Sequence, residues 1–545
     1  MLRIHTFLFA LGAFLSFPRL TLGELVQKQG LALPPQAEQL REEVKTIFTD
    51  SYGAYKKYAF GHDDVLPISQ GFYDGRNGWG ATIVDAMTTM NIMGLNDLFD
   101  EAVAFATNID FSRSHTDSTI SVFESTIRYM GALLSAYELS GGKFPDLVAK
   151  AQQLGDKLAF AWEGSNAIPY NNLNFTTNTP VKESSNIAQA GTLTLEWATL
   201  SKYTSNNTYL VLADKAFRSI VEGSTPLPGL PAQGVDPADS SPIGGYVTWG
   251  GGSDSYFEYL IKYPRLNSSF NSLYADSWIT AVDSSIRTLL RKSIPGNYTY
   301  LADYDSHGRI RHIGSHLACF YGGNWILGGK MLNNETVVNL GLELSDACWN
   351  TYASTATGIG PETFDFMSSD GSYTGSDQKD IPEDQIAFNE KHGFYIDAPY
   401  YVLRPEVLES NFYAWRATGD TKYIDRAAAA VKSFQTYLKV TDSGGYAGLH
   451  DVDNSSSDRV DDTESFWFAE VLKYLYLTFD DPEHISLDKY VFNTEAHPFE
   501  APATSEQTYS SGNTQPRSKK PFTPTTGKLP VVSPLPAVSN LPGSL

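Results

Sequence analysis

The sequence is short of cysteine, of basic residues and of long apolar runs, and each shortage argues against a class of protein. Two cysteines in 545 residues are too few for a disulfide-rich scaffold, and they lie in different motifs, which argues against a zinc site. The 62 acidic residues outnumber the 40 basic ones, and a net charge of −22 argues against a nucleic-acid partner. Beyond residue 17, no stretch approaches the ~20 apolar residues that a membrane-spanning helix needs.

The first 23 residues have the pattern of a secretory signal. Arg3 and His5 precede an apolar run over 6–17, and the segment ends at the small residue Gly23. Six N-x-S/T sequons agree with passage through the secretory pathway, at Asn174, Asn206, Asn267, Asn297, Asn334 and Asn454. We therefore expect a secreted protein. The alternative is an uncleaved signal that anchors the chain in the membrane of the endoplasmic reticulum or Golgi.

The rest of the chain has the pattern of one all-α domain. Residues 24–34 are a loose lead-in, and residues 35–498 repeat apolar positions at helical spacing, with few strand signals apart from 244–249. Helices are predicted at 37–58, 81–93, 97–107, 121–139, 144–162, 187–204, 206–223, 255–263, 269–290, 316–327, 334–351, 406–418, 421–436 and 463–479. Residues 499–545 are rich in Pro, Ser and Thr, which predicts a disordered tail. Periodicity alone leaves both a toroid of helical hairpins and a solenoid open.

Charged residues recur inside otherwise apolar helices. In YVLRPEVLESNFY, residues 401–413, Arg404 and Glu406 lie where a helix begins, near the positive end of its dipole. In SVFESTIRYMGALLSAY, Glu124 and Arg128 are four residues apart and therefore face the same way. A solvated ion pair or a helix cap is the ordinary explanation of each. The apolar surroundings favour burial, where an arginine and desolvation shift a carboxyl pKa in opposite directions.

Three further segments offer polar groups of the same kind. Asp254 follows the flexible run Gly250–Ser253 and is either a helix cap or a ligand contact. His312 and His316 have the i, i+4 spacing of zinc ligands, but Gly314 weakens the helix, so a role for His316 toward a sugar or a carboxylate is favoured. Phe466 and Glu470 share one face of a strongly apolar helix, where a lone glutamate is costly unless it serves a site.

Taken together, carboxylates embedded in aromatic helices favour glycoside chemistry, in which one acid protonates the leaving oxygen and one base activates water. No G-x-S-x-G motif is present, which argues against a serine hydrolase. In an oxidising compartment Cys319 and Cys348 are expected to form one disulfide, with two buried free thiols as the alternative.

Seven phrases of the sequence together resemble the class I α-1,2-mannosidases, glycoside hydrolase family 47. They occur in the family's order and are YAFGHDDVLPIS (58–69), SVFESTIRYMGALLSAY (121–137), GGGSDSYFEYL (250–260), SHLACFYGGN (315–324), YVLRPEVLES (401–410), TESFWFAEVLKYLYLTF (463–479) and FNTEAHP (492–498). The resemblance implies a single (αα)7 barrel and calcium-dependent, inverting hydrolysis of terminal α-1,2-linked mannose from high-mannose N-glycans.

The resemblance also implies roles for individual residues. Glu124 matches the proton donor, acting through a water, Glu406 matches the general base, and Asp254 is a third essential carboxylate; the choice of acid between Glu124 and Asp254 stays open. Thr494 matches the calcium ligand, through its hydroxyl and carbonyl oxygens, with waters completing the shell. Sugar-contacting or supporting positions are matched by Arg128, His316, Arg404, Phe466, Glu470 and Glu495, and the family's disulfide by Cys319 and Cys348.

One position departs from the family's pattern in a way that bears on specificity. Gly252 stands where the endoplasmic-reticulum type carries arginine, which favours broad α-1,2 trimming over removal of a single linkage. The alternative function is a lectin-like relative that binds mannose in glycoprotein quality control. Such a relative would be expected to lack one of Glu124, Asp254 and Glu406, and all three are present. We expect a monomer.

Overall fold

The computed structural model describes residues 25–267, 272–375, 381–502, 509–511 and 521–530. The predicted signal, residues 1–23, lies outside the described residues. None of the helices in the described ranges is long and apolar enough to cross a membrane.

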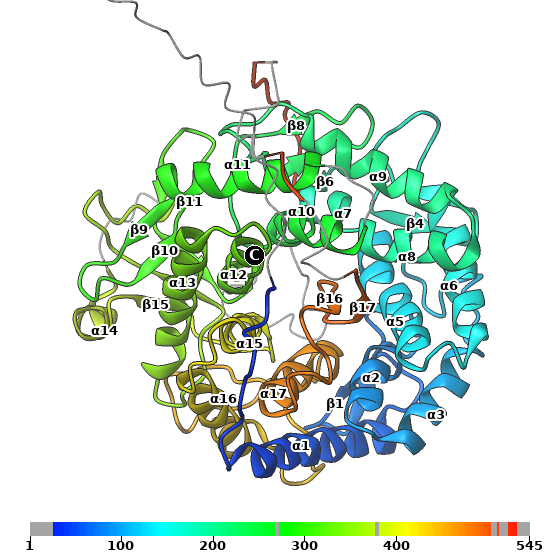
Figure 1. Cartoon of the computed structure of the whole chain (residues 1–545), viewed down its shortest axis with the longest axis horizontal. Coiled ribbons are helices and arrows are strands. Elements are labelled where there is room, and N and C mark those ends of the chain that lie inside the picture. Colours follow the sequence, from blue (N-terminus) through cyan, green and yellow to red (C-terminus); the bar gives the residue numbers. More distant parts are fainter. Residues whose placement is uncertain (1–24, 268–271, 376–380, 503–508, 512–520, 531–545) are drawn as a thin grey trace, which may run out of the picture.

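The helices form two concentric rings around a central axis (Figure 1). The outer ring consists of α1 (Ala37–Tyr58), α3 (Asn96–Ala106), α6 (Pro145–Leu158), α9 (Thr208–Val221), α11 (Ser272–Thr288), α13 (Glu335–Ala353) and α16 (Lys422–Ser433). The inner ring consists of α2 (Ala81–Ile92), α5 (Gly131–Leu139), α8 (Thr194–Thr204), α10 (Asp254–Leu266), α12 (Tyr321–Met331), α15 (Glu406–Thr418) and α17 (Leu472–Phe479). Consecutive inner helices touch, and the π-helical turn η6 (Trp467–Val471) before α17 closes the ring against α2. This is the predicted (αα)7 barrel.

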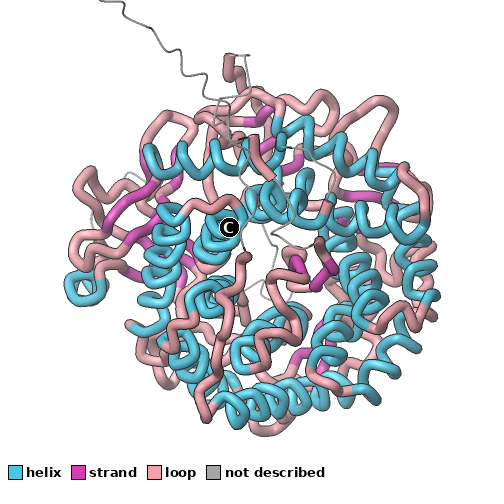
Figure 2. The backbone as a smooth tube through the Cα atoms, viewed as in Figure 1, coloured by secondary structure: helices cyan, strands magenta, loops and turns pink. Residues whose placement is uncertain are grey.

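Strands in the described part of the chain are short and lie in the loops between helices (Figure 2). They pair as antiparallel sheets of two or three strands. Their bounds are β1 (Asp64–Leu66), β2 (Gly71–Tyr73), β3 (Ile120–Ser121), β4 (Asn172–Asn174), β5 (Thr179–Pro180), β6 (Ser185–Asn186), β7 (Gly234–Val235), β8 (Pro242–Ile243), β9 (Leu290–Lys292), β10 (Thr299–Leu301), β11 (Asp303–Tyr304), β12 (Ile310–Arg311), β13 (Ile313–Ser315), β14 (Thr363–Asp365), β15 (Tyr395–Ala398), β16 (Tyr490–Phe492) and β17 (Pro498–Glu500). The prediction of a strand at 244–249 is wrong. β8 ends at Ile243, and residues 244–249 form only the isolated bridge between Val247 and Tyr304.

Helix boundaries follow the prediction where the ends carry clear signals and differ where the chain changes pitch. α1 and α15 begin and end at the predicted residues. The predicted helix 121–139 is divided into α4 (Val122–Glu124), the π-helical η1 (Ser125–Met130) and α5. The predicted helix 187–204 breaks at Thr192 and Leu193, between α7 (Ile187–Gly191) and α8. The short helix α14 (Ile386–His392) has no counterpart in the prediction.

Both ends of the predicted domain extend further than expected. In the lead-in, Val26 is buried and its N–H donates to the Asp488 carboxylate at 2.8 Å, so this segment packs on the barrel. At the other end, the predicted boundary at 498 falls inside β17, where Phe499 is buried. Tyr509 in the predicted disordered tail is also buried. Scattered large apolar residues within a polar sequence therefore order these segments by packing on the barrel.

Candidate active site

A cavity of 610 Å³ opens at the centre of the barrel and is lined by the first turns of α10 and α15, by the π-helical turns η1 and η6, and by the loops between helices. It has the size of a small-ligand site. Nine of the ten predicted catalytic, sugar-contacting and metal-ligand residues line it, namely Glu124, Arg128, Asp254, Arg404, Glu406, Phe466, Glu470, Thr494 and Glu495. The tenth, His316, lies directly behind Glu406. The structure thus brings together groups that are up to 371 positions apart in the chain (124 to 495).

Glu406 is the first residue of α15, so its carboxylate lies at the positive end of that helix. The preceding turn depends on Leu403, whose φ of 66° is in the left-handed region, and on Pro405 at the N-cap position. His316 Nδ1 lies 2.7 Å from Glu406 Oε2, and His316 Nε2 lies 2.6 Å from the Tyr352 hydroxyl, which fixes the imidazole ring. Although burial acts in the opposite direction, His316 and Arg404 lower the pKa of Glu406. Glu406 is therefore ionised at neutral pH.

Asp254 begins α10 and has the opposite electrostatic environment. Its Oδ1 accepts a hydrogen bond from the Ser255 N–H at 2.8 Å, and no cation pairs with it among the described residues. Burial, with smaller contributions from the carboxylates of Glu258 and Glu406, raises the pKa of Asp254 to about 7. Asp254 can therefore hold a proton at neutral pH while Glu406 is charged.

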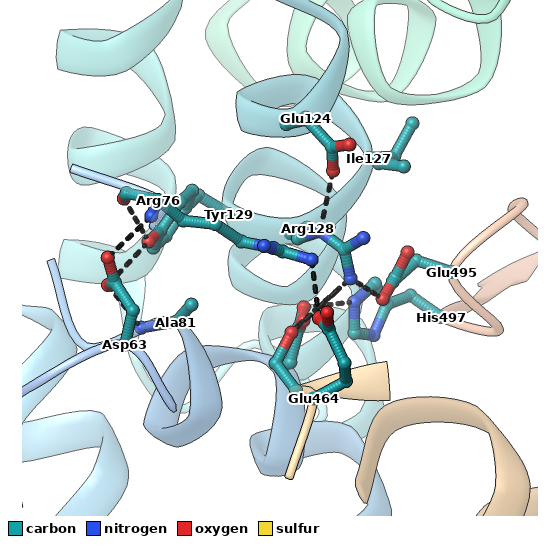
Figure 3. A network of polar contacts seen from close by, with 12 residues as sticks. Asp63, Arg76, Ala81, Glu124, Ile127, Arg128, Tyr129, Glu464, Glu495 and His497 are labelled. Atoms are coloured by element: carbon teal, nitrogen blue, oxygen red, sulfur yellow. Dashed lines mark hydrogen bonds and ion pairs between the residues drawn. The ribbon is translucent and has the colours of Figure 1, made fainter. Parts of the chain in front are cut away.

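Glu124 lies at the start of the π-helical turn η1 and pairs with Arg128 (Figure 3). Arg128 Nε donates to Glu124 Oε2 at 2.7 Å, and Arg128 Nη1 donates to the Glu495 carboxylate. The guanidinium also lies over the Phe466 ring, 5.7 Å from its centroid. Burial raises the pKa of Glu124, but the positive charges of Arg128 and Arg76 outweigh it and lower the pKa overall. The predicted, partly buried ion pair is confirmed.

The floor of the cavity is the loop 493–497 of the β16–β17 hairpin, which lies at the centre of the barrel in Figure 1. Asn493 organises the loop: its Oδ1 accepts from the N–H groups of Glu495 at 3.0 Å and His497 at 2.7 Å. Ala496 has a φ of 56°, in the left-handed region. His497 is fully buried, and burial lowers its pKa to about 4, so the imidazole is neutral. These contacts present Thr494 and Glu495 to the cavity.

Negative charge is in excess above this floor. Glu470 is 6% exposed and has no hydrogen bond or ion pair among the described residues. Burial, followed by the charges of Glu495, Glu406 and Glu409, raises its pKa well above the usual range. No group of three or more His, Cys, Asp and Glu in the described residues could hold a metal directly. The Thr494 and carboxylate oxygens that face the cavity are the type of ligand that a hard cation prefers.

The family is decided by comparison with known proteins. The model of glycosyl hydrolase family 47 matches residues 47–501. The chain belongs to glycosyl hydrolase family 47. A probable mannosyl-oligosaccharide α-1,2-mannosidase 1B of Aspergillus clavatus is 40% identical, over 88% of this chain and 98% of the relative. A mannosyl-oligosaccharide α-1,2-mannosidase of Penicillium citrinum is 38% identical, over 85% of this chain and 92% of the relative. The solved α-1,2-mannosidase of Trichoderma reesei is 35% identical with a TM-score of 0.81, covering 85% of this chain and 99% of that one.

Membership of family 47 confirms the predicted family, the barrel fold and the class of glycoside hydrolase. The predicted disulfide is also formed: Cys319 and Cys348 are bonded at 2.03 Å and link the turn before α12 to α13. The bond fixes the base of the segment that carries His316, since Cys319 follows that residue by three positions.

Several charged groups of this family 47 site were not predicted as site residues. Glu362 accepts hydrogen bonds on both oxygens, at 2.8 and 2.7 Å, from Nε of the predicted residue Arg404. Glu464 accepts a hydrogen bond from Arg76 Nη2 at 2.7 Å. Because the two residues of each pair are far apart in the sequence, no short-range spacing predicts these pairs. Glu258 and Glu409 had a local signal, because each lies one helical turn beyond a predicted carboxylate, Asp254 or Glu406.

Proposed function

We propose that this family 47 enzyme hydrolyses terminal α-1,2-linked mannose from high-mannose N-glycans, with inversion at the anomeric carbon and with calcium as cofactor. The main support is that two carboxyl groups of one cavity have pKa values shifted in opposite directions. The pKa of Asp254 is raised to about 7, and the pKa of Glu406 is lowered. Such a pair supplies an acid and a base at the same pH. The names of the curated relatives supply the mannose linkage.

In this mechanism Asp254 donates its proton to the glycosidic oxygen as the bond to the anomeric carbon breaks. Glu406 accepts a proton from the water that attacks the opposite face, so the configuration inverts. His316 keeps Glu406 ionised and oriented through their 2.7 Å contact. Because the pKa of Glu124 is lowered, its carboxylate is better suited to stabilise positive charge on the sugar, or to relay a proton through water, than to donate one directly.

The remaining side chains orient the sugar. Phe466 lines the cavity with an aromatic ring of the kind on which the apolar side of a pyranose packs, and the Arg128 guanidinium lies 5.7 Å from the centroid of that ring. Arg404 is held by Glu362 and faces the cavity next to Glu406. Glu470 and Glu495 provide acceptors for sugar hydroxyls and for metal-bound waters. When bound beside Thr494, calcium would supply a positive charge that neutralises these carboxylates and fixes hydroxyl groups.

Digestion of a nine-mannose N-glycan tests the proposal. Purified enzyme should release free mannose from α-1,2 linkages only, and proton NMR at early times should show β-mannose, the inverted anomer. Release of α-mannose would contradict the mechanism. Tight glycan binding without release of mannose would instead favour the lectin-like alternative. Secretion, and the state of the signal, are tested by N-terminal sequencing of the protein from culture medium; gel filtration tests the proposed monomer.

A further inference from the structure

The segment 521–530 of the C-terminal tail lies along the mouth of the catalytic cavity. The Thr525 N–H donates to the Pro242 carbonyl at 2.8 Å, and the Gly244 N–H donates to the Thr525 carbonyl at 3.1 Å. These bonds form a parallel bridge between Thr525 and Ile243, so the segment adds to the edge of the β6–β7–β8 sheet. We call residues 521–530 the tail strap.

The tail strap continues from this edge into the cavity itself. The Ser184 hydroxyl donates to the Lys528 carbonyl, and Leu529 packs directly on Gly234 of β7, where a Cβ atom would clash with it. As a result Lys528, Leu529 and Pro530 form part of the cavity lining, in the same wall as Ser184, Asn186 and Gln189. The catalytic carboxylates Asp254 and Glu406 line the same space.

Charge favours this position of the strap. The cavity is lined by many more carboxylates than cations, and its three arginines are already paired, Arg76 with Glu464, Arg128 with Glu124 and Arg404 with Glu362. Lys528 is exposed and has no ion pair among the described residues. A lysine in an acidic cleft gains long-range attraction without a fixed partner, and salt weakens that attraction.

The strap is an addition to the barrel rather than part of it. The family match ends at residue 501, and the Trichoderma reesei structure, 99% of which is covered, corresponds to only 85% of this chain. A second contact holds the connecting tail, since the Ser510 hydroxyl donates to Asp276 of α11 at 2.6 Å. The barrel therefore does not need the strap to fold, and the strap is free to serve the cavity.

We propose that the tail strap is a specificity element that narrows the outer part of the cleft and disfavours large, branched glycans relative to small α-1,2-linked mannosides. This inference rests on the proposed function. A disaccharide needs only the inner cavity between Asp254 and Glu406, whereas the remaining arms of a nine-mannose glycan must pass the wall that Lys528–Pro530 narrow. A large substrate therefore reaches the site only in the fraction of molecules whose strap is displaced, which raises its apparent KM.

The test compares kcat/KM for the nine-mannose glycan with kcat/KM for an α-1,2-linked mannose disaccharide. A chain ending at Ser511 lacks the strap, and a chain ending at Pro530 is its matched control. For the chain ending at Ser511 we expect the ratio of kcat/KM for the glycan to kcat/KM for the disaccharide to rise about fivefold, because a strap that is closed in most molecules has been removed. For the chain ending at Pro530 we expect the same ratio as for the full chain. An unchanged ratio in the chain ending at Ser511 overturns the inference.

Point variants separate the strap contact from shortening of the chain. Leu529→Asp should release the strap from Gly234 and raise the ratio, while Thr526→Asp adds the same charge at an exposed position and should leave it unchanged. Hydrogen exchange at the Gly244 N–H, which donates to Thr525, reports release directly. An increase in exchange without any change in the ratio would also overturn the inference. If neither substrate is cleaved by any variant, the proposed function itself is wrong.

Discussion

Replacing Asp254 by asparagine should stabilise the protein while it removes activity. A shift of the Asp254 pKa from 3.8 to about 7 means that the ionised form is disfavoured in the folded protein, by at most about 4 kcal/mol at 1.36 kcal/mol per pKa unit. The side chain is partly exposed to the cavity, so we expect roughly 2–4 kcal/mol. Asparagine carries no charge and escapes this cost. Dividing this increase in unfolding free energy by an entropy of unfolding of ~2.1 cal/mol/K per residue gives an increase in Tm of about 2–4 °C.

The stabilisation by Asp254→Asn should increase as the pH rises. Between pH 3.8 and 7 the folded state binds more protons at Asp254 than the unfolded state, so the wild type loses stability as pH rises through this window. The difference between Asp254→Asn and wild type should therefore vanish near pH 4 and be complete at pH 8. Activity should fall ~10²–10⁴-fold, the usual contribution of a general acid. In the wild type, kcat/KM should decline above pH 7 as Asp254 ionises.

Asp365 provides the matched control. Burial and the neighbouring Asp397 raise its pKa to about 8, but it lines a separate cavity beside β13 and β14. Asp365→Asn should raise Tm at pH 8 in the same way and leave kcat/KM unchanged. Scanning calorimetry at pH 4, 6 and 8 with parallel assays measures both effects. Normal activity in Asp254→Asn, or an equal Tm difference at pH 4 and pH 8, would refute this account of Asp254.

Three further predictions concern the base, the metal and the disulfide. Glu406→Gln should abolish turnover but leave circular dichroism and glycan binding intact; measurable turnover would remove the base assignment. Chelation by EDTA should lower both kcat and Tm, because a metal bound only by the folded state stabilises it, and added calcium should restore both; indifference to EDTA would reject the site at Thr494. Replacing Cys319 and Cys348 by alanine together opens a loop with a sequence separation of 29 and should cost about 3–4 kcal/mol in unfolding free energy, measured by denaturant titration.

The sequence was sufficient for features set by local spacing. Glu124 and Arg128 are four residues apart on one helical face, and the structure shows them as the expected, partly buried pair. Arg404 and Glu406 were placed correctly at the start of α15, because proline and an apolar stripe mark that helix. The convergence of the carboxylates on one cavity followed from the family resemblance, not from spacing, since no short-range pattern relates Glu124 to Glu495.

The sequence was insufficient where partners are distant or where backbone groups make the contact. Arg76 pairs with Glu464, which lies 388 positions later in the sequence, and the charge of Arg76 alone does not predict which carboxylate it binds. The tail was predicted to be disordered because it is rich in Pro, Ser and Thr. Thr525 is nevertheless bound, through backbone hydrogen bonds to a sheet edge, and such bonds depend little on side-chain identity.

The hairpin β16–β17 has a consequence for biosynthesis. The hairpin is synthesised after all the inner helices, yet its loop carries Thr494 and Glu495. Two hydrogen bonds attach this loop to the barrel: Lys473 Nζ donates to the Ala496 carbonyl, and Asn493 Nδ2 donates to the Ile127 carbonyl. A nascent chain can therefore assemble most of its helical wall before the residues at the centre of the site have been made. A chain that ends between Phe479 and Tyr490 contains all the ring helices but lacks Thr494 and Glu495, and we expect it to be inactive.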